Sequence, residues 1–146
     1  MRLCLLNRTT KNSSVYLIDT SVCVSLLRQR LPNARVRLRN LHPSEVAVST
    51  ICAAELYRGA AKSRNVNLDM SRVSDLLSLL RPIPFGSDAA LAYGFVRTLL
   101  ERKGELIGPF DMLIAAHALA EGATVVTHNT REFRRVPGLD VEDWND

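Results

Sequence analysis

The 146-residue sequence has few cysteines, few aromatic residues and no long apolar segment. Its three cysteines follow no Cys-x-x-Cys spacing, which argues against a disulfide framework or a zinc knuckle and favours a reducing, cytoplasmic setting. No apolar run approaches the roughly 18 residues of a membrane span, so we expect no membrane partner. Residues 1–14 lack the apolar core and cleavage site of a signal peptide, and we interpret them as a flexible N-terminal extension.

Lysine is also scarce, since 16 of the 19 basic residues are arginines. The formal net charge is +4, but three basic residues without an acidic partner lie in the extension, so the rest of the chain is almost neutral. Arginine suits two-point contacts with phosphate or carboxylate better than lysine does. Five arginines cluster within twelve residues, which indicates either a contact surface or a solvated helix face. They are Arg28, Arg30, Arg35, Arg37 and Arg39.

Short apolar runs typical of strands alternate with longer helical segments from Val15 onward. Strands are predicted at 15–19, 46–50, 83–85, 124–129 and 139–144. Helices are predicted at 20–31, 32–41, 51–63, 68–80, 87–104 and 108–122. This alternation predicts an α/β fold: a single doubly wound domain over residues 15–143, with a parallel four- or five-stranded sheet flanked by helices and a C-terminal tail at 144–146.

Three acidic residues from distant parts of the chain fall where the strands of such a sheet end. Asp19 closes the first strand, Glu55 lies one turn into the helix after the second, and Asp111 lies in the first turn of the helix before the fourth. Taken singly, Asp111 could cap its helix and Glu55 could face solvent. Together, three neighbouring carboxylates repel one another and therefore require a cation or raised pKa values.

Oxygen ligands without an organised histidine or cysteine favour Mg²⁺, or else Mn²⁺, over zinc. We expect Asp19 and Asp111 to bind the metal, and Glu55 to bind either the metal or a coordinated water. Four nearby polar residues would hydrogen-bond to a ligand carboxylate, to that water or to a phosphate group, although two of them could instead cap a helix. They are Thr20 and Ser21, which are also the predicted helix caps, and Thr127 and Asn129.

Four blocks of sequence, in this order, resemble the PIN-domain ribonucleases of the VapC toxin type. They are VYLIDTSV (15–22), STICAAELYRGA (49–60), GPFDMLIAAHALAEG (108–122) and VVTHNTREFRRVPGLDVEDW (125–144). The resemblance implies the toxin of a type II toxin–antitoxin system, a metal-dependent endoribonuclease with Asp19, Glu55 and Asp111 as its acidic site. It also implies a homodimer or a toxin–antitoxin hetero-oligomer, a VapB-like antitoxin, and an RNA substrate, with tRNA as one option. The arginine cluster would then contact RNA or the antitoxin.

One position departs from the pattern of this family. Asn129 stands where many PIN domains have a fourth acid, which leaves open whether one or two metal ions bind. Glu132, three residues later, could reach back toward the site or lie on the surface beside Arg131. Two functions therefore remain open. One is a Mg²⁺-dependent endoribonuclease that cleaves RNA with a metal-activated water, and the other is a catalytically impaired PIN-fold module that binds RNA.

Two other classes with an acidic rim fit the sequence less well. A phosphoacceptor receiver domain needs paired acids after the first strand and a lysine after a late strand, and this chain has neither. A haloacid-dehalogenase phosphatase needs Asp-x-Asp where this chain has Asp19, Thr20 and Ser21.

Overall fold

The computed structural model describes residues 15–145, so the predicted N-terminal extension lies outside it. Within that range, short parallel strands form a five-stranded sheet with the order β3-β2-β1-β4-β5. The strands are β1 (Tyr16–Ile18), β2 (Val46–Ser49), β3 (Arg81–Ile83), β4 (Thr124–Val126) and β5 (Asp140–Glu142). The prediction of a parallel four- or five-stranded sheet is confirmed.

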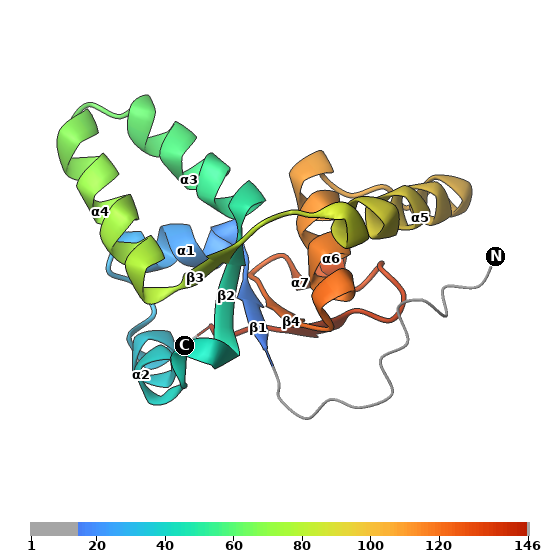
Figure 1. The fold of residues 1–146 in the computed structure, drawn as a ribbon, viewed down its shortest axis with the longest axis horizontal. Coiled ribbons are helices and arrows are strands. Elements are labelled where there is room, and N and C mark those ends of the chain that lie inside the picture. The colour runs from blue at the N-terminus through green and yellow to red at the C-terminus, as the bar shows by residue number, and fades with distance from the viewer. Residues whose placement is uncertain (1–14, 146) are drawn as a thin grey trace.

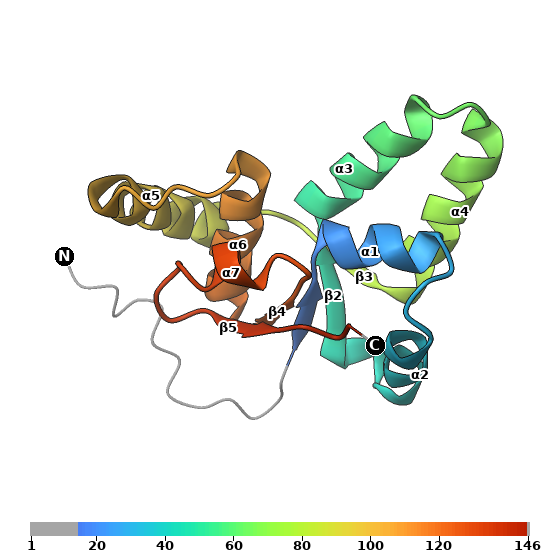
Figure 2. The same ribbon diagram turned by 180° about the vertical axis from the view of Figure 1, so that it is seen from behind.

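Helices make every connection between the strands. In chain order they are α1 (Thr20–Leu27), α2 (Pro32–Asn40), the 3-10 turn η2 (Pro43–Glu45), α3 (Thr50–Ala61), α4 (Val66–Leu79), α5 (Ser87–Lys103), α6 (Pro109–Glu121) and α7 (Thr130–Phe133). Figure 1 shows the α3–α4 pair on one side of the molecule and the α5–α6 pair on the other, and Figure 2 shows the same arrangement from behind. None of the helices in residues 15–145 has both the length and the apolar character needed to cross a membrane.

The order of the strands creates a switch point beside β1. The chain steps outward from β1 to β2 and β3, and then returns to place β4 and β5 on the other side of β1. Such a reversal leaves a crevice beyond the carboxyl ends of the two central strands, where ligands bind in doubly wound folds. Here those ends lead into Asp19 after β1 and Thr127 after β4. The topology therefore places Asp19 and Thr127 at the expected ligand-binding edge of the sheet.

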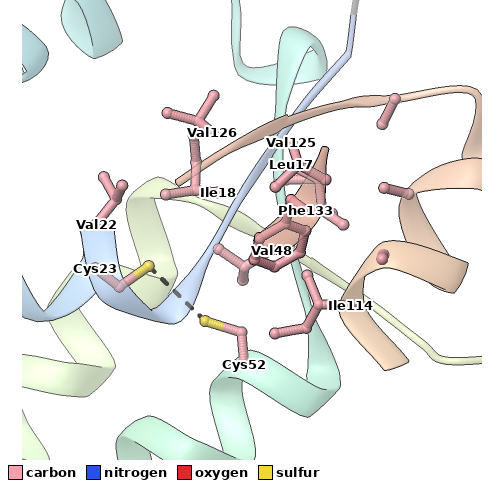
Figure 3. Packing of buried hydrophobic residues seen from close by; sticks show 14 of the residues in the cluster. Leu17, Ile18, Val22, Cys23, Val48, Cys52, Ile114, Val125, Val126 and Phe133 are labelled. Carbon is pink, nitrogen blue, oxygen red and sulfur yellow. Dashed lines mark hydrogen bonds between the residues drawn. The ribbon is translucent and has the colours of Figure 1, made fainter. Parts of the chain in front are cut away.

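The sheet is buried because its central strands are apolar on both faces. Leu17 and Ile18 of β1 and Val125 and Val126 of β4 have no exposed surface. Figure 3 shows side chains from the surrounding helices packed against them, among them Phe133 from α7. This rigid centre fixes the ends of β1 and β4 relative to each other.

Two free cysteines also lie in this core (Figure 3). Cys23 of α1 and Cys52 of α3 are fully buried, and their Sγ atoms are 3.9 Å apart. The hydrogen bond between the thiols, followed by burial, raises the pKa of Cys23, which keeps that thiol protonated. This agrees with the absence of a disulfide framework expected from the sequence; Cys4 lies outside the described residues.

The start of α1 differs from the prediction. Asp19, rather than Thr20 or Ser21, is the N-cap residue of α1, and both hydroxyl groups are used elsewhere: Thr20 donates to Glu55 and Ser21 donates to Asp19. Helix α5 begins at Ser87, the first residue of the predicted helix.

The third strand was misplaced by two residues. It runs over Arg81–Ile83 rather than 83–85, so Pro82 lies inside the strand. This strand is at the edge of the sheet, where a missing backbone N–H is tolerated. Helices α5 and α6 end as predicted at Gly104 and Gly122, which cap them with φ near 65°, a conformation that glycine adopts without strain.

Arg37 of α2 contacts both the C-terminal segment and the first strand of the sheet. Its guanidinium carbon lies 4.3 Å from the ring centroid of Trp144 and 5.5 Å from that of Tyr16, and its Nη2 donates to Glu142 Oε2 at 3.1 Å. The indole nitrogen of Trp144 donates to the same oxygen at 2.9 Å. Trp144 is only 4% exposed, so packing continues beyond residue 143, into the segment assigned from sequence to a tail.

Candidate functional site

The site begins at Asp19, a buried carboxylate between the two central strands. Its side chain is 1% exposed, and its Oδ2 accepts hydrogen bonds from Ser21 Oγ at 2.9 Å and from Thr127 Oγ1 at 2.7 Å. The other oxygen, Oδ1, is buried and has no hydrogen-bond partner among the described residues. Hydrogen bonds therefore hold Oδ2 in place, whereas Oδ1 has neither a donor nor a counter-charge within residues 15–145. Burying such an oxygen costs folding free energy.

The loop after β4 supports this arrangement. Thr127 Oγ1 accepts the backbone N–H of Asn129 at 2.9 Å, and Ser21 Oγ accepts the backbone N–H of His128 at 3.1 Å. Asn129 therefore contributes here through its backbone, and its side chain is exposed. Three of the four predicted supporting residues, Ser21, Thr127 and Asn129, are thus linked to Asp19 in one hydrogen-bonded network.

Replacing Thr127 by valine is expected to lower the free energy of unfolding by about 1–3 kcal/mol. Valine has nearly the same shape, but it removes a donor from the buried Asp19 carboxylate and an acceptor from the Asn129 N–H. Urea denaturation of the metal-free protein would measure the change. The control is Thr127→Ser, which keeps the hydroxyl and loses one methyl group; a valine variant no less stable than the serine variant would contradict the prediction.

Glu55 joins the site from the neighbouring helix. It lies in α3 and is half-buried, and its Oε1 accepts the hydroxyl of Thr20 at 2.7 Å. Burial raises the pKa of Glu55 and the negative charge of Asp19 raises it further, while the hydrogen bond from Thr20 acts in the opposite direction. The alternative that Glu55 simply faces solvent is therefore wrong, and Thr20, the fourth supporting residue, serves to position it.

Asp111 enters from α6, on the other side of the sheet. Its pKa is raised to about 6, first by burial and then by the negative charges of Asp19, Glu55 and Glu132. No side-chain hydrogen bond caps α6, whose N-cap residue is Gly108, so Asp111 is not engaged as a cap. The structure therefore brings Asp19, Glu55 and Asp111 into electrostatic contact, as their places in the sequence predicted.

A fourth carboxylate, Glu132, belongs to the same cluster. It lies in α7, is half-buried, and is close enough to raise the pKa of Asp111. From sequence it could equally have been a surface residue beside Arg131. The spacing in the sequence favours a place at the site. Glu132 follows Asn129 by three residues, about one helical turn, so the two side chains leave the helix on nearly the same side. Glu132 thus adds a negative charge to the cluster one turn after the neutral Asn129.

The chemistry of these carboxylates, rather than their spacing, favours a small divalent cation held by oxygen atoms. Across residues 15–145, no three His, Cys, Asp or Glu side chains stand together in an arrangement that would hold a metal ion. Carboxylates without a counter-ion repel one another, and Mg²⁺ requires only one or two of them because water fills its other positions. The partnerless Oδ1 of Asp19 and the raised pKa of Asp111 are the two observations that favour a cation here.

The five clustered arginines do not form one surface beside these acids. Arg37 is held by the C-terminal segment, and Arg35 donates to the backbone carbonyl of Leu26. Helix α2 lies at the edge of the sheet where β2 begins, whereas α3 leaves from the other end of that strand (Figure 1). Asp19 lies at the end where the strands finish, so the arginines of α2 are remote from it.

Arg28 is different, because it lines a groove that also contains Glu55. This groove, of about 350 Å³, lies between α1, α3 and α4. Its walls combine apolar side chains with more basic than acidic groups. They include Val24, Leu27, Leu56 and Val73, with Arg28, Lys62 and Arg72 opposed by Glu55 and Asp69. Arg28 is exposed, and so are Arg30 and Arg39 elsewhere.

Comparison with known proteins identifies the family. The model of the PIN domain matches residues 16–139. The chain belongs to the PIN-domain family. Within it, the chain resembles VapC proteins over almost its whole length, being 39% identical to Ribonuclease VapC2 of Rickettsia felis over 132 residues, which cover 90% of this chain and 98% of that protein.

Two further VapC comparisons agree. The chain is 37% identical to the tRNA(fMet)-specific endonuclease VapC of Salmonella typhimurium, over 88% of this chain and 97% of the relative. The crystal structure of DNA-bound VapBC from the same organism contains a chain that matches with a TM-score of 0.85, at 37% identity, over 90% of this chain and 98% of that one. The predicted resemblance to PIN-domain ribonuclease toxins of the VapC type is confirmed.

Proposed function

We propose that this VapC-family protein is the toxin of a type II toxin–antitoxin system and acts as a Mg²⁺-dependent endoribonuclease, for which Mn²⁺ could substitute. The observation that carries the proposal is the group of four carboxylates at the β1–β4 switch point, one of which has a buried oxygen without a partner. The names of the relatives, ribonuclease and tRNA(fMet)-specific endonuclease, support RNA as the substrate.

Each residue has a distinct role in this proposal. Asp19 and Asp111 would hold the cation, and Glu55 would hold it or a coordinated water. When bound, the cation supplies a water of lowered pKa and offsets charge on the phosphate. Ser21 and Thr127 keep Asp19 in place through its Oδ2.

Thr20 and Glu132 support the acidic residues, and the reaction cleaves one phosphodiester bond. Thr20 holds Glu55 and so ties α3 to α1. Glu132 adds negative charge to the cluster, which strengthens the attraction for a cation. Water oxygen would bond to phosphorus while the bond to the 3′ oxygen breaks, which leaves a 5′-phosphate and a 3′-hydroxyl.

The partners follow from the surface and from the relatives. The relative from Salmonella typhimurium was solved as VapBC, and we propose that a VapB-like antitoxin binds the groove between α1, α3 and α4. An antitoxin segment with apolar and acidic side chains would match its apolar walls and its excess of basic groups. Arg28, Arg30 and Arg39 are left to contact RNA or the antitoxin. A homodimer or a toxin–antitoxin hetero-oligomer, and a cytoplasmic location, remain predictions.

The test is cleavage of purified tRNA. Initiator tRNA is incubated with the protein in Mg²⁺, in Mn²⁺ and in EDTA, with an elongator tRNA as the matched control, and the new 5′ ends are sequenced. We expect cleavage with either metal, loss in EDTA, and recovery on adding excess Mg²⁺. RNA that is bound but not cut in either metal would favour the RNA-binding module instead. Binding should also weaken steeply with salt, and an unchanged affinity between low and physiological salt would contradict the phosphate contacts.

A further inference from the structure

Two aromatic side chains in the described part of the chain are exposed, and both lie close in sequence to a site carboxylate. Phe110, which is 53% exposed, directly precedes Asp111, and Tyr57, which is 41% exposed, follows Glu55 by two residues. The other aromatic side chains in residues 15–145 are buried or half-buried. Phe110 is therefore the more exposed of the two rings, and it directly precedes Asp111 in α6.

Phe110 is not explained by packing of its helix. The buried side of α6 starts at Met112 and continues through Ile114 to Ala118, and Phe110 is not part of the hydrophobic core. It follows Pro109, whose ring fixes the backbone at the start of the helix. Phe110 and Asp111 are adjacent in α6, with Cα atoms about 3.8 Å apart and side chains that leave the helix about 100° apart, so the ring lies on the face beside the one that carries the carboxylate.

Two arginines lie on segments connected to the elements of the site. Arg135 donates its Nη1 to the backbone carbonyl of Leu106 at 3.1 Å, in the connection that leads into α6. Arg131 is exposed on α7, beside Glu132, whose charge reaches Asp111. Proteins hold single-stranded RNA by combining exposed aromatic rings, on which bases stack, with basic side chains that contact the phosphates.

We propose that Phe110 stacks on a nucleobase beside the scissile phosphodiester and so holds the RNA strand across the carboxylate cluster. The proposal rests on the proposed ribonuclease function and extends it to a substrate-contacting residue. A competing occupant of the same surface is a second copy of the chain, because Leu106 is also exposed nearby. Substitution of Phe110 distinguishes these two occupants.

The experiment uses an RNA hairpin that carries 2-aminopurine in its loop, placed in turn at each position, and Ca²⁺ in place of Mg²⁺ to limit cleavage. Stacking on a protein ring quenches 2-aminopurine fluorescence, so the readout does not depend on catalysis. We expect wild type to quench one or two positions. Phe110→Ala should lose this quenching and raise Kd about tenfold or more, while Phe110→Trp should restore both.

The matched control is Tyr57→Ala, since Tyr57 is also exposed but lies about 200° around α3 from Glu55. It should leave quenching and Kd unchanged. A Phe110→Leu variant that behaves as wild type would overturn stacking, and so would equal losses in the alanine variants at both positions. If Phe110→Ala is monomeric where wild type is dimeric, the ring belongs to a contact between copies.

The outcomes also separate this inference from the proposed function. Wild type that binds no RNA would overturn both. RNA cleavage with unchanged RNA binding by Phe110→Ala would overturn only the stacking role of Phe110.

Discussion

Asp111→Asn is expected to abolish RNA cleavage while making the metal-free protein more stable. The substitution keeps the shape of the side chain but removes the charge proposed to hold the cation, so we expect the cleavage rate to fall about a thousandfold or more, as when several kcal/mol of transition-state stabilisation are lost. Single-turnover cleavage of tRNA at saturating Mg²⁺ measures this effect.

The gain in stability follows from the pKa of Asp111, which is raised to about 6. A carboxyl group with a raised pKa binds its proton more tightly in the folded than in the unfolded state, so its ionised form destabilises the fold above pH 6. After allowance for partial exposure to solvent, removing that charge should raise the free energy of unfolding by about 1–2 kcal/mol at pH 7.5. The gain should shrink toward pH 4, where Asp111 is protonated in both states.

Asp88→Asn provides the matched control for both readouts. Asp88 lies in the first turn of α5, as Asp111 does in α6, but it is exposed and is not among the charges that raise the pKa of Asp111. We expect full activity and no gain in stability. Substantial cleavage by Asp111→Asn would reject its role as a ligand, and equal stability changes in the two variants would show that the carboxylate cluster is not strained.

The main acids of the candidate site could be predicted because the topology dictates their positions. A residue that ends a buried parallel strand must lie at the carboxyl edge of the sheet, so Asp19 could be placed before any side chain was seen. The partners of Thr20 and Ser21 could not, because a hydroxyl at a helix start can cap the helix or bind elsewhere, and the choice depends on Glu55 and Asp19. Glu132 was ambiguous because α7 is only four residues long, too short for a helical pattern to show in the sequence.

The arginine cluster shows where reasoning from sequence distance fails. Five arginines within twelve residues indicated either a contact surface or a solvated helix face, but the turn between α1 and α2 separates them. Gln29 and Leu31 both adopt left-handed backbone conformations there, with φ of 57° and 60°, which residues other than glycine seldom do. Nothing in the sequence marks these two positions. The chain consequently reverses, and Arg37 is carried to the start of β1 rather than to its end.

Binding of Mg²⁺ is expected to weaken about tenfold when the pH is lowered from 7 to 5. With a pKa of about 6, Asp111 is mostly ionised at pH 7 and mostly protonated at pH 5, and the proton competes with the cation for the same carboxylate. Glu55, whose pKa is also raised, would add to the effect in the same direction. Titration calorimetry in buffers of different ionisation enthalpy gives both the affinity and the number of protons released.

Calorimetric titration of variants shows which carboxylate causes the pH dependence of Mg²⁺ binding. Near pH 6, wild type should release close to half a proton from Asp111 on binding each cation, while Asp111→Asn should release only the smaller contribution of Glu55 and bind more weakly at every pH. Asp88→Asn should match wild type. Because the raised pKa of Asp111 arises from burial and from the charges of Asp19, Glu55 and Glu132, Glu132→Gln should lower that pKa and shift the loss of Mg²⁺ binding to a lower pH. A pH dependence that Glu132→Gln leaves in place would mean that the four carboxylates do not act as one site.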